Sequence, residues 1–457
     1  MRAATWPLDT HSFASRLNVA ILAISLIASF LLFTILGSAA TLELLSLVGG
    51  AVVLLAYPEF ALAAFLVVGD VKGDVRIAAL FPCDLTLAVG AIVILGILIN
   101  LVRTKRIAAL PSIYLLFLPL VAIMALSLAY TPVFSAGLEK LGLFVTVTAI
   151  AILAPFFVLP DAHAVKRFLW AFGCAAYAIC LISLAGLGGT DRLVTPSDNT
   201  IGLGRLACVL AAIIWFAFIP NANLRRRLLG YAILAVPLIA MIGSGSRGSA
   251  ISFAVLILGT LFFYCRLAFD IAALAVVGTT ALPFIDIPQA SFRYLGSLFG
   301  AQTVGGLLDF RADLLAYGWQ LLKQHPLIGA GIGGFRYSSP NPGLYKWPHD
   351  IFIELACELG IPAALIGVAV FGSAIRESIR QLRDTPSPYF TFSMIAAALL
   401  WIGVVAAITT GNVNSDRSIW LFISLVFVIR SYRLERREGV AIQVKATVPG
   451  ALVPART

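Results

Sequence analysis

Apolar, charge-poor runs of about 20 residues recur along this chain, from Asn18 almost to its C-terminus, and each is long enough for a helix to cross a bilayer. Backbone polar groups in lipid must be paired within their own segment, so such runs fold as helices, and the alternating pattern of an outer-membrane barrel is absent. Of the 457 residues, 60% are hydrophobic and 12% are charged, whereas a soluble domain carries roughly 25% charged residues. The sequence therefore predicts an all-α polytopic membrane protein.

The apolar runs predict about 12–14 transmembrane helices and one long, partly helical loop. The run from Glu59 to Gly69 is too short to cross comfortably, and Pro58 predicts a broken or re-entrant helix at this place. Four parts are expected: an N-terminal transmembrane bundle at 1–284, a large loop at 285–350, C-terminal transmembrane helices at 351–437 and a disordered tail at 438–457.

The positive charge of the chain is arranged as a topology signal. Most of the 32 Lys and Arg residues fall in short clusters on one side of the predicted helices. Because cytoplasmic loops collect Lys and Arg, both termini are expected in the cytoplasm and the long loop in the periplasm of a bacterial inner membrane. The net charge of +10 therefore does not indicate a nucleic-acid partner. The six cysteines have neither paired nor metal-ligand spacing and are interpreted as core residues.

The long loop changes in character along its length. Phe310 to Leu322 predicts a helix that ends at His325-Pro326, and a glycine-rich turn at Gly329 to Gly334 follows. The Leu, Trp and Tyr residues of the helix are expected at headgroup depth on the membrane surface. The loop is either part of a functional site or a passive amphipathic lid.

His349 and the acids after it are the first candidates for chemistry. His349 follows Pro348 at the start of a membrane helix, whose positive end lowers the pKa of a nearby histidine and favours the neutral ring that acts as a general base. Glu354 and Glu358 lie one turn apart in an apolar run, where acids are costly and usually functional. Glu354 is expected to orient His349 or to pair with an arginine. The alternatives are a helix-capping histidine and acids that join helices.

Three arginines are candidates for binding a diphosphate. Arg247 lies in the tight turn from Gly243 to Ser249, on the side where Lys and Arg are disfavoured, and together with Ser246 and the glycine amides it would form an anion cradle. Arg311 opens the loop helix and is a second candidate. Arg205 is a third, and it alternatively extends to the membrane interface.

A polar cluster occupies the last predicted outer loop, where Asn412, Asn414, Asp416 and Arg417 follow each other closely. These residues either line a sugar site or close a turn. The chain has no nucleotide-binding P-loop, no His-Glu-x-x-His motif and no Gly-x-Ser-x-Gly elbow. Four histidines are also too few for a histidine-rich metal site. Chemistry without a metal or a cofactor is therefore expected.

The order of these motifs resembles the O-antigen ligase and polymerase superfamily of bacterial membrane glycosyltransferases. The resemblance covers about Ile201 to Ile366. It is carried by Ser246-Arg247-Gly248, by Arg311 ahead of His325-Pro326-Leu327-Ile328-Gly329, and by His349-Asp350 with Glu354 and Glu358.

The resemblance implies an inverting, metal-independent transfer of a glycan from undecaprenyl diphosphate to a sugar hydroxyl. It implies that His349 activates the hydroxyl and that Arg247 and Arg311 hold the diphosphate. A ligase would use the lipid A core as its acceptor, and a polymerase would use a lipid-linked glycan. Membrane lipid and other polysaccharide assembly proteins are the further partners that the resemblance implies. Asp350 stands where the family commonly has Asn, and its carboxylate would raise the pKa of His349 unless it binds the amides of the helix.

Two other functions compete with the enzyme. In a flippase or transporter of lipid-linked sugars the arginines would bind the diphosphate only in transit, but the unusual polar residues cluster on the outer side rather than through both leaflets, which favours the enzyme. A non-catalytic partner in an assembly complex is the third possibility.

Overall fold

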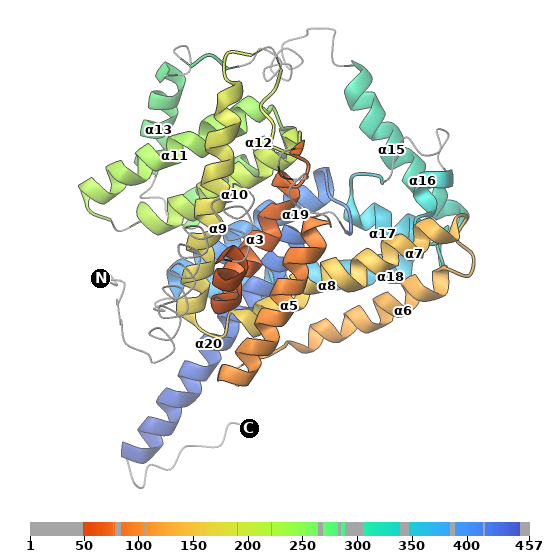
Figure 1. Ribbon diagram of the computed structural model, residues 1–457, viewed down its shortest axis with the longest axis horizontal. Coiled ribbons are helices and arrows are strands. Elements are labelled where there is room, and N and C mark those ends of the chain that lie inside the picture. The colour runs from red at the N-terminus through yellow and green to blue at the C-terminus, as the bar shows by residue number, and fades with distance from the viewer. Residues whose placement is uncertain are drawn as a thin grey trace, which may run out of the picture.

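The computed structural model describes residues 49–75, 77, 84–104, 107–189, 191–220, 222–263, 268–281, 285–287, 305–338, 347–383, 389–414 and 416–447. Within these ranges every regular element is a helix (Figure 1). Seven helical segments are long and apolar enough to cross a membrane, or eight with one bent pair. The chain is thus an all-α, multi-pass membrane protein, as predicted. The first expected span, Asn18 to Gly37, lies outside the described residues, so the total of 12–14 spans stays a prediction.

The segments long enough to span are α5 (Leu85–Thr104), the continuous run of α7 (Phe134–Leu143), η2 (Phe144–Thr148) and α8 (Ala149–Val158), α9 (Ala162–Ser183), α10 (Thr200–Phe218), α11 (Leu224–Ser244), α18 (Ile361–Arg383) and α19 (Phe390–Thr409). The other helices are α3 (Pro58–Val71), η1 (Ser112–Leu116), α6 (Phe117–Ser127), η3 (Leu184–Gly186), α12 (Arg247–Phe263), α13 (Ala268–Ala281), α15 (Gly305–Gln324), α16 (Gly334–Ser338), α17 (Ile351–Leu359) and α20 (Arg417–Thr447).

The break at Pro58 is present. The helix Gly49–Ala56 and α3 meet at 117°, and Pro58 is the first residue of α3, where its missing N–H costs nothing. At the other end of the chain, α20 continues to Thr447. Residues 438–447 are therefore helical, although the sequence predicts a disordered tail from 438. Glu, Ala, Gln and Lys are good helix formers, so a helix that begins in the membrane can continue through them.

The apolar first part of α20 is the central element of the fold. Every side chain from Ile419 to Ile429 is buried, and α20 packs against α8, α18 and α19. A helix that is apolar on all sides is stable only when it is enclosed. Trp420 lies in its first turns and contacts Phe144 and Phe371 edge to face, with centroids 6.4 and 5.7 Å apart. This packing fixes the polar start of α20 at one end of the bundle.

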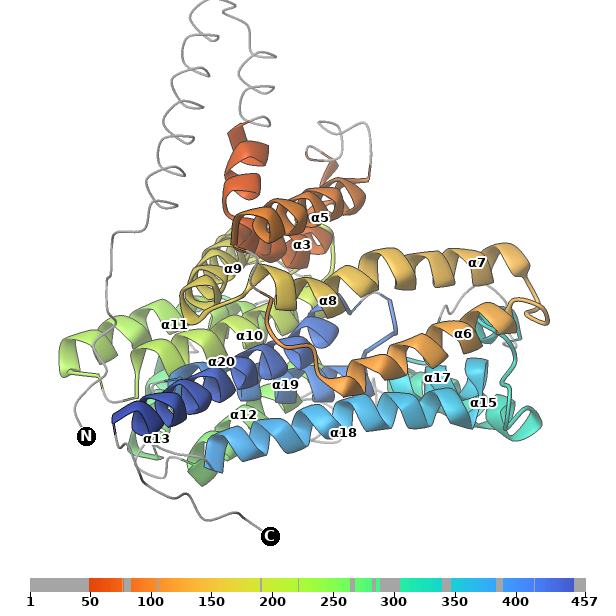
Figure 2. The same cartoon turned by 90° about the horizontal axis from the view of Figure 1, so that it is seen from below.

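Two further groups of helices flank this centre. The first has α10 between α9, α11, α12 and α19, and the second places α15, α16 and α17 at the end where α6 and α7 meet (Figure 2). Polar segments of both groups converge on the loop between α19 and α20. That loop is where the candidate site lies.

Candidate functional site

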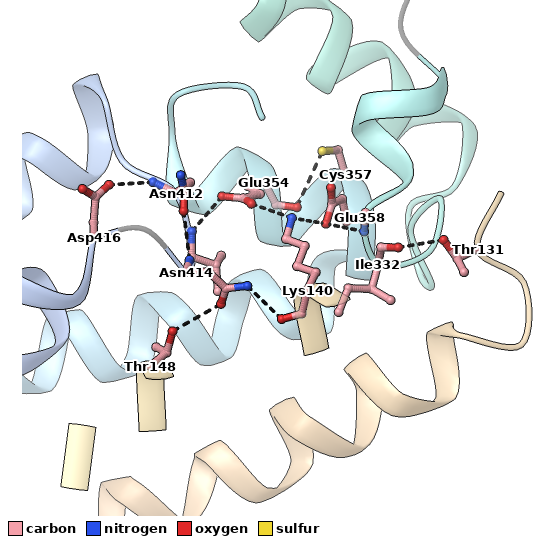
Figure 3. Close-up of polar contacts among 12 residues, drawn as sticks. Thr131, Lys140, Thr148, Ile332, Glu354, Cys357, Glu358, Asn412, Asn414 and Asp416 are labelled. Atoms are coloured by element: carbon pink, nitrogen blue, oxygen red, sulfur yellow. Dashed lines mark hydrogen bonds and ion pairs between the residues drawn. The ribbon is translucent and has the colours of Figure 1, made fainter. Parts of the chain in front are cut away.

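Glu354 and Glu358 lie one turn apart on α17 and share a single cation, Lys140 of α7 (Figure 3). Its Nζ atom is 2.5 Å from Glu354 Oε1 and 2.5 Å from Glu358 Oε2, and both acidic side chains are only 2% exposed. Lys140 is thus the partner that Glu354 has here, in place of the expected His349 or arginine. The two acids act as a link between helices, which is one of the alternatives the sequence leaves open.

The other contacts of the two acids tie separate segments to α17. Glu354 Oε2 accepts the N–H of Val413, 2.9 Å away, in the loop between α19 and α20. Glu358 Oε2 accepts the N–H of Gly333, also at 2.9 Å, in the glycine-rich turn. Hydrogen bonds to ionised groups are about twice as strong as neutral ones. The Lys140 cluster therefore joins α7, α17, the last loop and the glycine turn.

The glycine-rich turn that the sequence predicts at Gly329 to Gly334 folds back onto the end of α17. Ala330 and Gly331 donate their N–H groups to the carbonyls of Cys357 and Glu358, each at 2.9 Å, and so satisfy acceptors that the last helical turn leaves open. A Cβ atom at position 329 would overlap the backbone of Glu358. Three residues of the turn have positive φ: Gly329 at 67°, Gly331 at 89° and Gly333 at 75°. Only glycine takes these conformations without strain.

The loop between α19 and α20 closes on itself. Asp416 Oδ2 accepts the N–H of Asn412 at 2.8 Å, and Asn412 Oδ1 accepts the N–H of Asn414 at 2.9 Å. The Asn414 amide then donates to the carbonyl of Lys140 at 2.8 Å and accepts from Thr148 at 3.3 Å (Figure 3). The polar cluster is thus a turn held to α7 and η2, which is the second of its two predicted roles.

Arg205 is bound within the protein. Its guanidinium forms an ion pair with Asp416 and donates to Thr410 Oγ1 at 2.8 Å. The side chain is largely buried, so it does not extend to the membrane interface as one alternative predicts. These contacts connect α10 to both sides of the loop that contains Asn412 and Asn414. A role in diphosphate binding would require Arg205 to act from within this network.

His349 adopts a left-handed conformation with φ of 63° immediately before α17. The backbone carbonyl of Thr410 accepts a hydrogen bond from its ring, and the ring lies edge to face with Trp347, with centroids 6.0 Å apart. His349 Nδ1 is buried and has no hydrogen-bond partner among the residues that the structure describes. Because a carbonyl only accepts, a neutral ring that donates to Thr410 from its other nitrogen would carry its lone pair on Nδ1.

The environment of His349 favours the neutral ring. Burial lowers its pKa below the ordinary value of 6.5, the positive charge of Arg311 in α15 lowers it further, and the Thr410 carbonyl opposes both. The direction agrees with the sequence prediction, and burial and Arg311 are causes that the sequence does not show. The structure thus brings Arg311 and His349 into one electrostatic environment. A left-handed histidine at such a site is uncommon and typical of functional segments.

Asp350 does not turn toward His349. Its carboxylate caps α17 and accepts the N–H groups of Phe352 and Ile353 at 2.8 and 3.0 Å. Burial raises the pKa of Asp350, and the two amides partly offset that rise. An aspartate that binds the free amides of the helix leaves the histidine uncharged, so the departure from the family's Asn does not conflict with a neutral His349.

The turn that contains Arg247 is short and tightly packed. Gly245 ends α11 in a left-handed conformation with φ of 57°, and α12 begins at Arg247. Ser246 is buried and its hydroxyl accepts from Ser249 at 3.0 Å. A Cβ atom at Gly204 of α10 would lie 2.8 Å from the Ser246 Cβ atom, so α10 lies directly against the turn. Ser246 therefore faces the protein interior.

The Arg247 turn and His349 meet at the same end of α19. A Cβ atom at Gly248 would lie 2.9 Å from Thr409 Oγ1 and 3.5 Å from the Thr410 methyl group. Thr410 is also the residue that holds the His349 ring. The turn that contains Arg247 and the segment that contains His349 therefore approach each other at this end of α19.

Two residues of the site escape the sequence prediction. Thr410 acts through its backbone carbonyl, which no sequence pattern marks. Lys140 does carry a signal, because it is one of the few cations in a short segment on the side where Lys and Arg are disfavoured. The same signal identifies Arg247, and it applies equally to Lys140.

Comparison with known families gives one match. Residues 232–368 match the family model described as O-antigen ligase. No curated protein matches the chain. The matched segment contains Arg247, Arg311, His349, Glu354 and Glu358, whereas Lys140 and the loop between α19 and α20 lie outside it. Over residues 232–368 the chain is thus similar to the O-antigen ligase family, which supports the resemblance to the O-antigen ligase and polymerase superfamily that the sequence motifs indicate.

Proposed function

We propose that the protein is an inverting, metal-independent glycosyltransferase that moves an oligosaccharide or polysaccharide from undecaprenyl diphosphate to a sugar hydroxyl. The reaction would take place at the periplasmic face of the bacterial inner membrane, with both termini in the cytoplasm. The observation that carries the proposal is the setting of His349: its buried Nδ1 has no hydrogen-bond partner among the described residues, and burial and the charge of Arg311 both lower the pKa of its ring. The Arg247 turn approaches the same end of α19.

The proposed step needs one base and a stabilised leaving group. The acceptor oxygen attacks C1 of the donor sugar from the side opposite the diphosphate and gives its proton to His349 Nδ1. The bond between C1 and the diphosphate oxygen breaks and leaves its electron pair on that oxygen. Arg247 and Arg311 offset the charge that develops there, because guanidinium groups bind phosphate oxygens in a bidentate manner. Attack from the opposite side inverts the configuration at C1.

The other polar residues of the site position this machinery. Asp350 and Glu354 both act on α17, directly behind His349, by capping the helix and by joining it to Lys140 and Val413. We therefore assign Glu354, Glu358, Asn412 and Asn414 to positioning rather than to proton transfer. An acidic residue that is already shared with a lysine is a poor base for a sugar hydroxyl.

The acceptor decides between two forms of the proposal. Lipid A core as acceptor would make the protein a ligase, and a second lipid-linked repeat would make it a polymerase. Both use the same donor and the same base. Supplying each acceptor separately to the purified protein with a lipid-linked donor distinguishes the two.

The variant that tests the proposal is His349→Asn. Asparagine tolerates the left-handed conformation better than alanine does, so the loop is retained while the base is lost. Product formation should fall by about 10²–10⁴-fold, the usual contribution of a general base. The matched control is His325→Asn, because His325 is an exposed histidine of the same loop and should be dispensable.

Unchanged product formation in the His349→Asn variant would contradict the proposal. Movement of the lipid-linked sugar across the membrane without transfer to an acceptor would favour the flippase instead. Normal polymer in cells with His349, Arg247 and Arg311 all replaced would favour a non-catalytic partner.

A further inference from the structure

An apolar groove of about 700 Å³ lies between α9, α10 and α11. It is within the size range of small-molecule and lipid sites. The groove lies at the far end of α10 from the candidate site: Arg205 and Phe218 are on the same helix, roughly 20 Å apart at 1.5 Å per residue. Its wall is formed mainly by aliphatic and aromatic side chains, among them Trp170, Leu181, Ile213, Ile214, Leu229 and Ile233.

Two cations stand at one end of the groove, Lys166 near the start of α9 and Arg226 near the start of α11. They are close enough for their charges to act on each other. Arg226 is held in place, because it donates to the carbonyl of Ala217 at 2.9 Å and lies 5.6 Å from the centre of the Phe218 ring. No acidic residue lines the groove in the described part of the chain. Lys166 and Arg226 thus make this end of the groove basic.

Trp170 marks the same end. It lies one turn after Lys166 on α9, is 54% exposed and contacts the Phe218 ring edge to face, with centroids 6.2 Å apart. Exposed tryptophans in membrane proteins collect at headgroup depth. The groove thus has a charged end at the membrane interface and an apolar body that extends toward the membrane interior.

We propose that this groove binds an anionic phospholipid, with the headgroup phosphate on Lys166 and Arg226 and an acyl chain along the apolar wall. Basic pockets between transmembrane helices on the cytoplasmic side bind acidic lipid headgroups in this manner. The site is separate from that of the sugar donor, whose diphosphate belongs with Arg247 and Arg311 at the opposite end of the helices. It would hold α9, α10 and α11 together from the other leaflet, whatever reaction the His349 site performs.

Cys174 supplies a reporter inside the groove. It is exposed and lines the groove, whereas Cys180, Cys208 and Cys357 are buried. The full chain, with Cys83 and Cys265 replaced by serine, is placed in bilayers of phosphatidylcholine with increasing fractions of phosphatidylglycerol. The rate at which a membrane-permeant maleimide modifies Cys174 is then measured. Bound lipid should slow the modification at low fractions of the anionic lipid.

The charge dependence tests the assignment. Two contacts from Lys or Arg to an anionic headgroup correspond to roughly a 30-fold preference over a neutral lipid. The Lys166→Gln/Arg226→Gln variant should therefore need roughly 30-fold more phosphatidylglycerol for the same protection. Arg225→Gln is the matched control, because it removes a neighbouring cation that does not line the groove and should leave the protection unchanged.

Three results would overturn the proposal. One is a modification rate of Cys174 that does not change with phosphatidylglycerol, and another is an equal loss of protection in the Arg225→Gln variant. The third is a Cys174 that stays unreactive in phosphatidylcholine alone, because the groove would then be filled without regard to headgroup charge. Mass spectrometry of lipid retained by the native and double-variant proteins gives an independent measurement, and equal retention of phosphatidylglycerol would also refute the site.

Discussion

Lys140→Met should destabilise the fold more than most single substitutions in this chain. The change removes the one cation that lies 2.5 Å from both Glu354 and Glu358 and leaves two acids that are each 2% exposed. Removal of one partner from a buried ion pair costs about 3–5 kcal/mol, because an uncompensated charge remains. Each acid keeps one backbone N–H, from Val413 and from Gly333, and a proton shared between the acids relieves part of the repulsion. We therefore expect about 3–4 kcal/mol rather than twice that cost.

The second half of the experiment removes the acids as well. In Lys140→Met with Glu354→Gln and Glu358→Gln no charge is left in the cluster, and the glutamine oxygens can still accept the two N–H groups. Replacing a whole buried ion cluster by neutral groups is often close to neutral in stability. The triple variant should therefore be more stable than Lys140→Met by about 2 kcal/mol or more.

Unfolding of the purified protein by SDS in mixed micelles, followed by tryptophan fluorescence, measures both differences. Trp420 reports on the affected region, because its indole N–H donates to the carbonyl of Val413 at 2.9 Å. A Lys140→Met variant within about 0.5 kcal/mol of the native protein would refute the buried cluster, since that is the usual effect of a surface substitution. A triple variant less stable than Lys140→Met would show that the acids contribute without the lysine, which contradicts the same reasoning.

Three further predictions concern the loop around His349. Activity that depends on neutral His349 is complete above the lowered pKa of its ring and is lost as the pH falls through that pKa. Arg311→Gln removes a charge that lowers this pKa, so the acidic limb of the pH profile of activity should move to higher pH. Arg311→Lys keeps the charge and should leave the acidic limb in place. Gly329→Ala should lower the free energy of unfolding by about 1–2 kcal/mol through left-handed strain alone, and by more through overlap with the backbone of α17. The control Gly372→Ala lies in open space on a helix and should raise the free energy of unfolding by about 0.5–1 kcal/mol in the same assay. Asp350→Asn should keep its cap and its activity, and Asp350→Ala should lose about 1 kcal/mol of stability.

Features that depend on a short stretch of chain are predictable from the sequence. The break at Pro58, the helix α15 and the turn at Gly329 each follow from the residues that form them. Apolar runs likewise identify membrane helices, because lipid imposes the same requirement on every span. The cap that Asp350 provides is also local, and it removes the one conflict that the sequence raises about His349.

Contacts between distant segments are not predictable in this way. Glu354 and Glu358 are recognisable as costly acids, but their partner Lys140 lies on another helix more than two hundred residues earlier. Nothing in either segment specifies that α7 passes beside α17, because that depends on how all the helices pack. Arg205 is the same case, since its partner Asp416 belongs to the start of α20. Arg205 therefore looks like a ligand-binding residue in the sequence alone.

Four of the cations on the outer side of the predicted topology contact an acceptor from another segment of the chain. Lys72 binds Asp84 at 2.9 Å, Lys140 binds two acids, and Arg205 binds Asp416. Arg417 donates to the carbonyl of Phe65 at 3.1 Å and lies 4.9 Å from the centre of its ring. Each of these Lys and Arg residues, on the side where such residues are disfavoured, is thus held by an acceptor from another segment. Its position therefore indicates a tertiary contact more directly than it indicates a ligand site. Arg311 is distinguished from these cations by its effect on the pKa of His349, and Arg247 by a turn that reaches the same end of α19. The diphosphate role proposed for both therefore depends on His349 being the base.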